Sequence, residues 1–232
     1  MKKLDEITEY YGPILAKGAF ELGAIKLSPS APFTWASGYR MPIYNDNRMF
    51  LASPKYRALI RDAFADMLSA SGEKCDNIAG TATAGIPHAT SLADMLYKPL
   101  SYVRSSSKDH GLGHQIEGIS KEGYGGQKVV LIEDLISTGS SSLKAVEAIR
   151  KANGDCTLCL AIFTYGLKAS SDAFAALDPE CVCHTILSYD TMIHAACETG
   201  YITADEADIL QDWRTDPFGW GEKRGFPREV KE

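Results

Sequence analysis

The stretch VVLIEDLISTGSSS, residues 129–142, combines residue types that suit a sugar phosphate. Its apolar start predicts a buried strand over Val129–Ile132. Glu133 and Asp134 should emerge at the carboxyl end of this strand, on opposite faces if the strand continues that far. Carboxylates accept hydrogen bonds from sugar hydroxyls but repel a phosphate. The two acids therefore predict contact with the diol of a ribose.

The residues after the acids suit the phosphate of the same ligand. They lead into a predicted helix, whose N-terminal N–H groups and dipole attract anions. Gly139 permits close approach of the backbone to the ligand. Hydroxyl donors are available from Ser137, Thr138, Ser140 and Ser141. The segment thus predicts acids on the ribose hydroxyls and a loop on the 5′-phosphate.

Other interpretations of this stretch are less consistent with the sequence. A Walker B strand would require a G-x4-G-K-[ST] loop, but Ile86 and Pro87 follow the nearest match, Gly80-x4-Gly85. The dinucleotide pattern fails in GLGHQI, where Ile116 occupies the third glycine position. An ordinary strand end followed by a Ser/Thr-capped helix fits equally well. The stretch alone does not decide between that arrangement and a ligand site.

A long polar segment precedes this strand. Ser105–Gln127 contains 23 residues and six glycines, and Arg104, Lys108 and His110 lie close together at its start. Loops of this length inside a compact domain are usually lids or disordered insertions, and cations on a glycine-hinged segment suit an anionic substrate. The alternative to a lid is a solvated loop without a function. The pattern favours a lid.

The elements that position these residues follow from hydrophobic periodicity. A helix is expected over 5–22 with Gly23 at its end, then short strands in FTWAS and MPIYND around Gly38, and a helix from Ser53 to Ala70. Strands NIAG, LSYVR, KVVLI and CTLCLAIF then alternate with helices. Further helices and one more strand are expected in SDAFAAL, VCHTIL, TMIHAACE and ADEADILQDW. This alternation predicts a parallel sheet with helices on both faces.

Length, composition and charge limit the function classes. The 232 residues, 45% hydrophobic, predict one domain with a full core. No apolar run reaches the ~20 residues of a membrane span, and MKKLDEITEYYG lacks the apolar core of a signal peptide, so a cytoplasmic location is expected. The net charge of −6 and the scattered Lys and Arg argue against a nucleic-acid partner.

The six cysteines raise the possibility of a metal site. Cys156 and Cys159 form a C-x2-C, and Cys181 and Cys183 lie beside His184. On a strand, Cys156 and Cys159 are expected to point to opposite faces, and no second pair at zinc-finger spacing completes four ligands. Buried reduced thiols are favoured.

Six strings between about residues 24 and 213 resemble the type I phosphoribosyltransferases, and among them the branch that acts on orotate. They are PFTWASG, PIYNDNR, AGTATAGIPHA, YVRSSSKDHGLGHQIEG, EDLISTGSS and IFTYGL. The resemblance implies an α/β fold with a central parallel sheet flanked by helices, a small N-terminal hood and a long mobile catalytic loop. It divides the single domain 1–232 into the N-terminal helix and hood (1–52), the core (53–215) and an irregular tail (216–232), whose first half Trp213, Phe218 and Trp220 would hold.

The resemblance also implies an activity, a cofactor and partners. Ribose 5-phosphate would pass from phosphoribosyl pyrophosphate (PRPP) to N1 of orotate, giving orotidine 5′-monophosphate and pyrophosphate in pyrimidine biosynthesis. Mg²⁺ would arrive with PRPP and have no direct protein ligand. The protein would be a homodimer whose loop serves the neighbouring subunit. No membrane partner is expected.

Residue roles follow from the same resemblance. Lys108, His110 and Arg104 would act in catalysis on the leaving pyrophosphate and bind PRPP. The remaining PRPP contacts would be Glu133, Asp134, Leu135, Ile136, Ser137, Thr138, Gly139, Ser140 and Ser141. Ser137 would also contact orotate. Candidates for orotate contacts by position alone are Tyr44, Asn45, Arg48 and Tyr165.

Four positions depart from another branch of the family. Ser105 replaces a second loop lysine and Ala84 a pyrophosphate-binding lysine, while Gly166 and Ala36 replace an arginine and a lysine near orotate. Two alternative functions therefore stay open: transfer to another nucleobase, and a non-catalytic PRPP-binding regulator.

Overall fold

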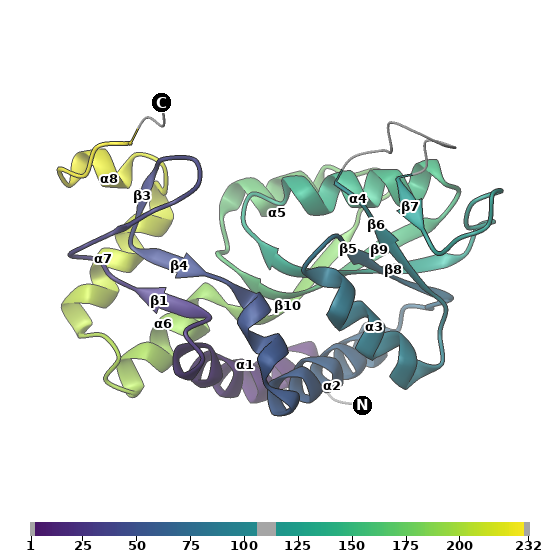
Figure 1. Ribbon diagram of the computed structural model, residues 1–232, viewed down its shortest axis with the longest axis horizontal. Coiled ribbons are helices and arrows are strands. Elements are labelled where there is room, and N and C mark those ends of the chain that lie inside the picture. The colour runs from purple at the N-terminus through teal and green to yellow at the C-terminus, as the bar shows by residue number, and fades with distance from the viewer. Residues whose placement is uncertain (1–2, 106–114, 230–232) are drawn as a thin grey trace.

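A six-stranded sheet forms the centre of the molecule (Figure 1). The structure, a computed structural model, describes residues 3–105 and 115–229. The strand order is β10-β9-β8-β5-β6-β7, and every pairing is parallel except that of β7 with β6. The strands are β5 (Asn77–Thr81), β6 (Leu100–Val103), β7 (Ile116–Glu117), β8 (Lys128–Ile136), β9 (Asp155–Thr164) and β10 (Val182–Ser188). The predicted α/β class is confirmed.

Helices cover both faces of this sheet. On the lower face in Figure 1 lie α1 (Leu4–Glu21), α2 (Pro54–Ser71) and α3 (Gly85–Leu96), and on the upper face α4 (Ser140–Lys151) and α5 (Lys168–Ala175). Side chains of β8 alternate between two apolar clusters, because successive residues of a strand point to opposite faces. Val130 and Ile132 belong to the lower cluster, Val129 and Leu131 to the upper one.

The helix that opens the core begins and ends as predicted. The Ser53 hydroxyl accepts a hydrogen bond from the backbone N–H of Tyr56 at 3.4 Å, and Pro54 occupies the first turn, where its missing N–H is harmless. Gly72 ends α2 with φ +71°, a conformation that glycine adopts without a steric penalty.

The hood consists of two small antiparallel sheets and one 3₁₀ helix. β1 (Ile25–Leu27) pairs with β4 (Ile43–Asn45), β2 (Phe33–Thr34) pairs with β3 (Arg40–Met41), and η1 covers Asn47–Ala52. The predicted turn at Gly38 is present, with φ +83°. FTWAS and MPIYND predicted two strands; FTWAS contains β2, but MPIYND is divided between β3 and β4, and β1 and η1 were missed.

Two predicted boundaries were wrong. β8 does not end at Ile132 but continues to Ile136, because its neighbour β9 keeps pairing with it as far as Ile136↔Thr164. The segment 105–127 is not free of secondary structure, because β7 adds to the edge of the sheet beside β6.

The C-terminal segment is more ordered than its composition predicted. After α6 (Tyr189–Glu198) and α7 (Ala204–Thr215), a short helix α8 (Trp220–Lys223) buries Trp220. Glu229 then reaches the hood hairpin: its carboxylate accepts hydrogen bonds from Thr34 (2.9 Å) and Arg40 (2.8 Å), and its N–H donates to the carbonyl of Gly38 (2.9 Å). Trp213 is buried as expected, whereas Phe218 is 45% exposed.

The cysteine side chains lie in or beside the core as free thiols. The prediction that Cys156 and Cys159 face opposite ways was wrong, because a β-bulge near Lys128 and Val130 places both in the upper cluster. Cys159 lies opposite Cys183 on β10. Within 3–105 and 115–229, no group of three or more His, Cys, Asp or Glu could hold a metal ion.

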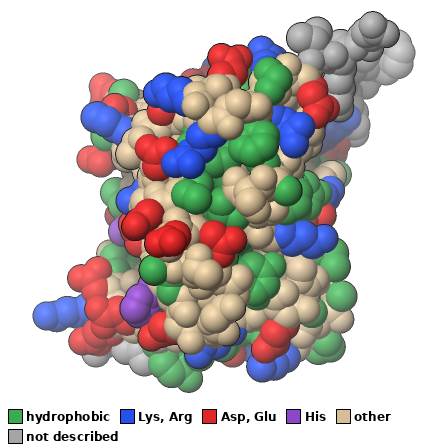
Figure 2. All heavy atoms as spheres, turned by 90° about the vertical axis from the view of Figure 1, so that its left-hand side faces the viewer, with side chains coloured by type: hydrophobic (Ala, Val, Ile, Leu, Met, Phe, Trp, Pro, Cys, Tyr) green, Lys and Arg blue, Asp and Glu red, His purple; other side chains and the backbone are tan. Residues whose placement is uncertain are grey.

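The surface over the hood and the C-terminal helices shows acidic, basic and hydrophobic side chains side by side (Figure 2). None of the helices that the structure describes is both long and apolar enough to cross a membrane.

Candidate active site

Two adjoining cavities lie at the carboxyl ends of β5 and β8, where ligands bind in open parallel sheets. The acidic pocket, about 260 Å³, is lined by Asn45, Asp46, Arg48, Thr81, Ala82, Thr83, Ala84, Glu133, Asp134 and Ser141. The basic pocket, about 350 Å³, is lined by Thr81, Ala82, Val103, Arg104, Ser105, Gln115, Ser140, Ser141, Lys144 and Ala145. Both acids of the predicted motif therefore line one cavity with part of the hood.

Glu133 is buried and fully engaged with the protein. Its Oε1 accepts hydrogen bonds from the Thr81 hydroxyl (2.5 Å) and the Asp134 N–H (3.0 Å). Its Oε2 accepts from the hydroxyls of Ser142 (2.9 Å) and Ser141 (3.4 Å). These four donors come from β5, β8 and α4, so Glu133 fixes the three elements around the pocket.

Asp134 is half-buried, and its side chain is the less engaged of the two acids. Burial, followed by the hydrogen bond and the negative charge of neighbouring Glu133, raises the pKa of Asp134 to about 7. Arg48 opposes this shift. The Asn47 amide donates to the backbone carbonyl of Asp134 at 2.6 Å and thereby ties the hood to β8. Near neutral pH the site can thus change its charge by one proton.

The predicted phosphate loop connects β8 to α4. Gly139 is buried at the N-cap of α4 with φ +80°, and an added Cβ would lie only 3.2 Å from Cε2 of Phe174. Both observations explain why glycine is needed there. Ile136 is buried in the upper cluster and Leu135 packs against the lower one, so only their backbone groups are available to a ligand.

The predicted loop cations are only partly described. Lys108 and His110 lie outside the described residues. Arg104 lines the basic pocket and exchanges backbone and side-chain hydrogen bonds with Gln115, both at 2.9 Å. Its Nη1 is buried without a hydrogen bond, and Oε1 of Glu117 lies 3.9 Å away.

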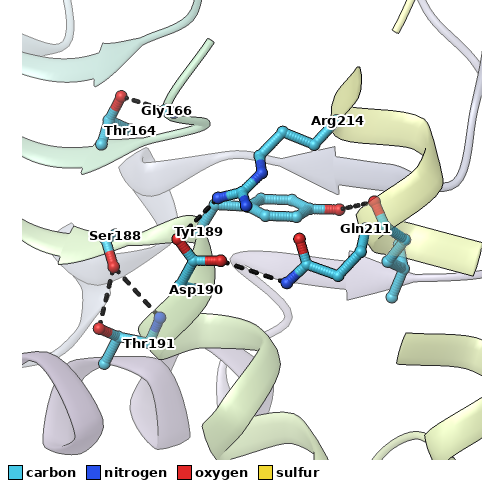
Figure 3. A network of polar contacts seen from close by, with 9 residues as sticks. Thr164, Gly166, Ser188, Tyr189, Asp190, Thr191, Gln211 and Arg214 are labelled. Carbon is cyan, nitrogen blue, oxygen red and sulfur yellow. Dashed lines mark hydrogen bonds and ion pairs between the residues drawn. The ribbon is translucent and has the colours of Figure 1, made fainter. Parts of the chain in front are cut away.

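The guanidinium of Arg214 lies beside Gly166, one of the four positions that differ from the other branch of the family. An added Cβ there would be 3.8 Å from Nη1 of Arg214, which reaches over from α7. Arg214 donates to Oδ2 of Asp190 at 2.7 Å and stacks over the Tyr189 ring at 5.5 Å, as Figure 3 shows. Gln211 donates to the other Asp190 oxygen at 3.2 Å. Sequence reasoning missed this arrangement because it brings together α6, α7 and the turn that follows β9.

The remaining positional candidates differ in their surroundings. The Tyr165 ring is buried among Trp35 and Trp213, with ring centroids 5.8 and 5.4 Å away, so it belongs to the core. Tyr44 is 39% exposed. Asn45 lines the acidic pocket, and both polar atoms of its amide are enclosed without a hydrogen-bond partner.

Among the pocket residues that sequence reasoning missed is Lys144, which lines the basic pocket from the second turn of α4. The resemblance placed TATAGIP (residues 81–87) near the pyrophosphate, but it did not predict that Thr81, which ends β5, donates to Glu133. Helical spacing contained a signal for Lys144, because it follows Ser140 and Ser141 by four and three residues. Thr81 carried no comparable signal, since it is 52 residues from Glu133.

Comparison with known proteins identifies relatives over most of the chain. A model of the phosphoribosyl transferase domain matches residues 46–183. The orotate phosphoribosyltransferase of Listeria monocytogenes serotype 4b is 46% identical over 208 residues, which cover 89% of this chain and 97% of that protein. The enzyme of that name from Lactococcus lactis subsp. cremoris MG1363 is 45% identical over 207 residues, 89% and 96% of the two chains.

Solved structures agree with these relatives. The orotate phosphoribosyltransferase from Aeropyrum pernix matches with a TM-score of 0.67 and 26% identity, over 82% of this chain and 99% of that one. The Leishmania donovani UMP synthase, at 23% identity and a TM-score of 0.71, covers 88% of this chain with 42% of its own length and supports the fold alone.

Proposed function

The chain belongs to the orotate phosphoribosyltransferase family, and from this premise we propose that the two pockets bind PRPP while its ribose 5-phosphate passes to N1 of orotate. The products are orotidine 5′-monophosphate and pyrophosphate, and the reaction belongs to pyrimidine biosynthesis. The observation that carries the proposal is the acidic pair Glu133–Asp134 placed directly before the glycine-capped N-terminus of α4. Acids beside a helix N-terminus suit a ligand with both a diol and a phosphate.

The two acids have different tasks in this proposal. Asp134 binds the ribose hydroxyls, because its carboxylate is the less engaged one. Glu133 holds Thr81, Ser141 and Ser142 with its two oxygens and keeps the pocket in shape. The backbone N–H groups and hydroxyls of Ser137–Ser141 bind the 5′-phosphate, and Ser137 also contacts orotate.

The reaction needs no protein nucleophile. As pyrophosphate leaves C1 of the ribose, negative charge grows on the leaving group, so cations placed there stabilise the transition state more than the ground state. Lys108 is the first candidate for this contact, and Arg104 and His110 assist. At neutral pH the negative charge of orotate lies on its carboxylate, and N1 still carries a proton. As the N1–C1 bond forms and pyrophosphate leaves, this proton passes to the departing pyrophosphate or to water, so we assign no protein residue as a general base.

Magnesium fits the oxygen donors of the acidic pocket. Asp46, Asp134 and Asn45 offer carboxylate and amide oxygens, the ligand type that Mg²⁺ prefers. In our proposal the ion would arrive with PRPP and would be held mainly by PRPP oxygens and water beside these groups. When bound, Mg²⁺ neutralises charge on the pyrophosphate.

The activity is tested by following the loss of orotate absorbance with Mg-PRPP. Uracil, adenine and hypoxanthine are assayed in parallel, because PRPP binding alone does not determine the base. We expect turnover with orotate. Turnover of a purine and none of orotate would instead assign the chain to another base, and PRPP binding without any turnover would indicate a regulator.

We also propose a homodimer whose loop serves the neighbouring site. Subunits carrying Lys108→Ala are mixed with subunits carrying Asp134→Asn and allowed to exchange. Random pairing makes about half of the dimers hybrids, and one site in each hybrid then has both an intact motif and an intact loop, so roughly a quarter of all sites should recover. Activity that stays at the level of the parents, with hybrids verified by mass spectrometry, would show that the loop acts within its own subunit.

A further inference from the structure

The basic pocket offers chemistry that the sugar site does not use. It adjoins the acidic pocket, with which it shares Thr81, Ala82 and Ser141. Two cations, Arg104 and Lys144, line it, and no carboxylate is among its described lining residues. The acidic pocket by contrast is lined by three carboxylates. The two cavities thus divide the charge of the site into a region suited to hydroxyls and a region suited to an anion.

Lys144 is placed to contact a ligand in the basic pocket. It lies one helical turn after Ser140 and Ser141, on the same face of the 12-residue helix α4. Within residues 3–105 and 115–229 its ammonium group makes no hydrogen bond or ion pair. The buried Nη1 of Arg104, which also lacks a hydrogen bond, belongs to the same cavity. Two cationic groups without strong partners therefore surround one space.

The basic pocket adjoins only one end of the predicted phosphate loop, because Ser140 and Ser141 line it but Gly139 does not. Gly139 lies against Phe174 of α5, and α5 packs beside β10 on one side of β8. The basic pocket lies on the other side, where Val103 ends β6 and Arg104 follows it. An anion in the basic pocket therefore contacts the Ser140–Ser141 end of the loop on the β6 side, and the Gly139 end faces α5.

We propose that Lys144 binds the pyrophosphate group of PRPP in the basic pocket, together with Arg104. This inference rests on the proposed function and identifies a residue that the sequence motif does not contain. Ala84 lines only the adjoining acidic pocket, so the cations that line the basic pocket among the described residues are Arg104 and Lys144.

The test is a binding measurement with two phosphate ligands. Calorimetry with Mg-pyrophosphate and, separately, with ribose 5-phosphate compares the wild type with Lys144→Ala. We expect roughly tenfold weaker binding of pyrophosphate, because one charged hydrogen bond is lost. Binding of ribose 5-phosphate should not change. In steady-state kinetics the KM for PRPP should rise while the KM for orotate stays the same.

Lys151→Ala is the matched control. Lys151 lies in the last turn of the same helix, 3.8 Å from Glu147, and lines neither pocket. An equal loss of pyrophosphate binding in both variants would mean a general charge effect and would overturn the assignment. Unchanged pyrophosphate binding in Lys144→Ala, or a loss limited to ribose 5-phosphate, would also overturn it.

A rescue variant gives an independent readout. Adding Ala84→Lys to Lys144→Ala returns a cation to the adjoining pocket and should recover part of the pyrophosphate affinity. The outcome is distinguishable from failure of the proposed function, because a wild type that does not consume orotate would reject that function whatever Lys144 does.

Discussion

Asp134→Asn should make the ligand-free protein more stable at neutral and alkaline pH while it weakens PRPP binding. The folded protein holds the Asp134 proton up to about pH 7, whereas an unfolded chain releases it near the ordinary pKa of 3.8. Between these values the unfolded state binds fewer protons than the folded state. The free energy of unfolding therefore falls as the pH rises from about 4 to 7. Asparagine avoids this loss because its amide resembles the protonated acid.

The size of the effect follows from the same shift. A rise from 3.8 to about 7 is worth at most about 4 kcal/mol at 1.36 kcal/mol per pH unit. Solvent screening of the half-buried carboxyl reduces this figure, so we expect about 1 to 4 kcal/mol above pH 7. For a chain of this size, each kcal/mol changes the melting temperature by about 2–4 °C. The melting temperatures of the wild type and Asp134→Asn should differ least near pH 4 and most above pH 7.

Thermal unfolding from pH 4 to 9, followed by circular dichroism, measures this difference. Asp46→Asn is the control of opposite sign, because the Arg48 guanidinium lowers the pKa of Asp46, so removing that charge should destabilise the protein above pH 4. Calorimetry with Mg-PRPP should show weaker binding by Asp134→Asn. A stability difference that does not change with pH, or a less stable Asp134→Asn at pH 8, would refute the reasoning.

Three further predictions concern the loop, the hood and the tail. Lys108→Ala should lower kcat by ~100- to 1000-fold with a smaller effect on PRPP affinity, and near-normal turnover would make it an ordinary loop lysine. Asn45→Leu should raise the free energy of unfolding by about 1–3 kcal/mol, because it removes two enclosed polar atoms that have no hydrogen-bond partner. The same change should lower the activity. An activity equal to that of the wild type would show that the Asn45 amide does not contact the substrate. Gly38→Ala should destabilise the protein more than Gly72→Ala and expose the tail to proteases. Both glycines have positive φ, so alanine at either position adds ~1–2 kcal/mol of backbone strain. Only at Gly38 would the added Cβ also clash with the Glu229 carbonyl. Equal melting temperatures would show that the tail contact contributes nothing.

Local pattern determined the order of the elements and the main motif. Apolar runs with a period of two or 3.6 gave the core strands and helices from residue 53 onward, because each such element buries one face against its neighbours. The pair Glu133–Asp134 and the loop to Ser141 are contiguous in the sequence, so the sequence alone predicted which acids and hydroxyls make up the motif. The resemblance to a known family then supplied the activity, which composition alone does not contain.

Only the tertiary structure distinguished the two acids. Along the chain Glu133 and Asp134 are adjacent and equivalent, but Thr81 and α4 enclose the first and leave the second less engaged. The strand that carries them continues past them because β9 pairs with it, a partner that the periodicity of β8 does not reveal.

The tertiary structure alone also decided which distant segments complete the site and the hood. Asn47 contacts the backbone of Asp134 across 87 residues of sequence, and Glu229 contacts Thr34 across 195. The cavity that unites Arg104 with Lys144 likewise depends on β6 and α4 lying side by side. Periodicity reports which face of an element is buried. It does not report which other segment covers that face, because that choice depends on the packing of the whole chain.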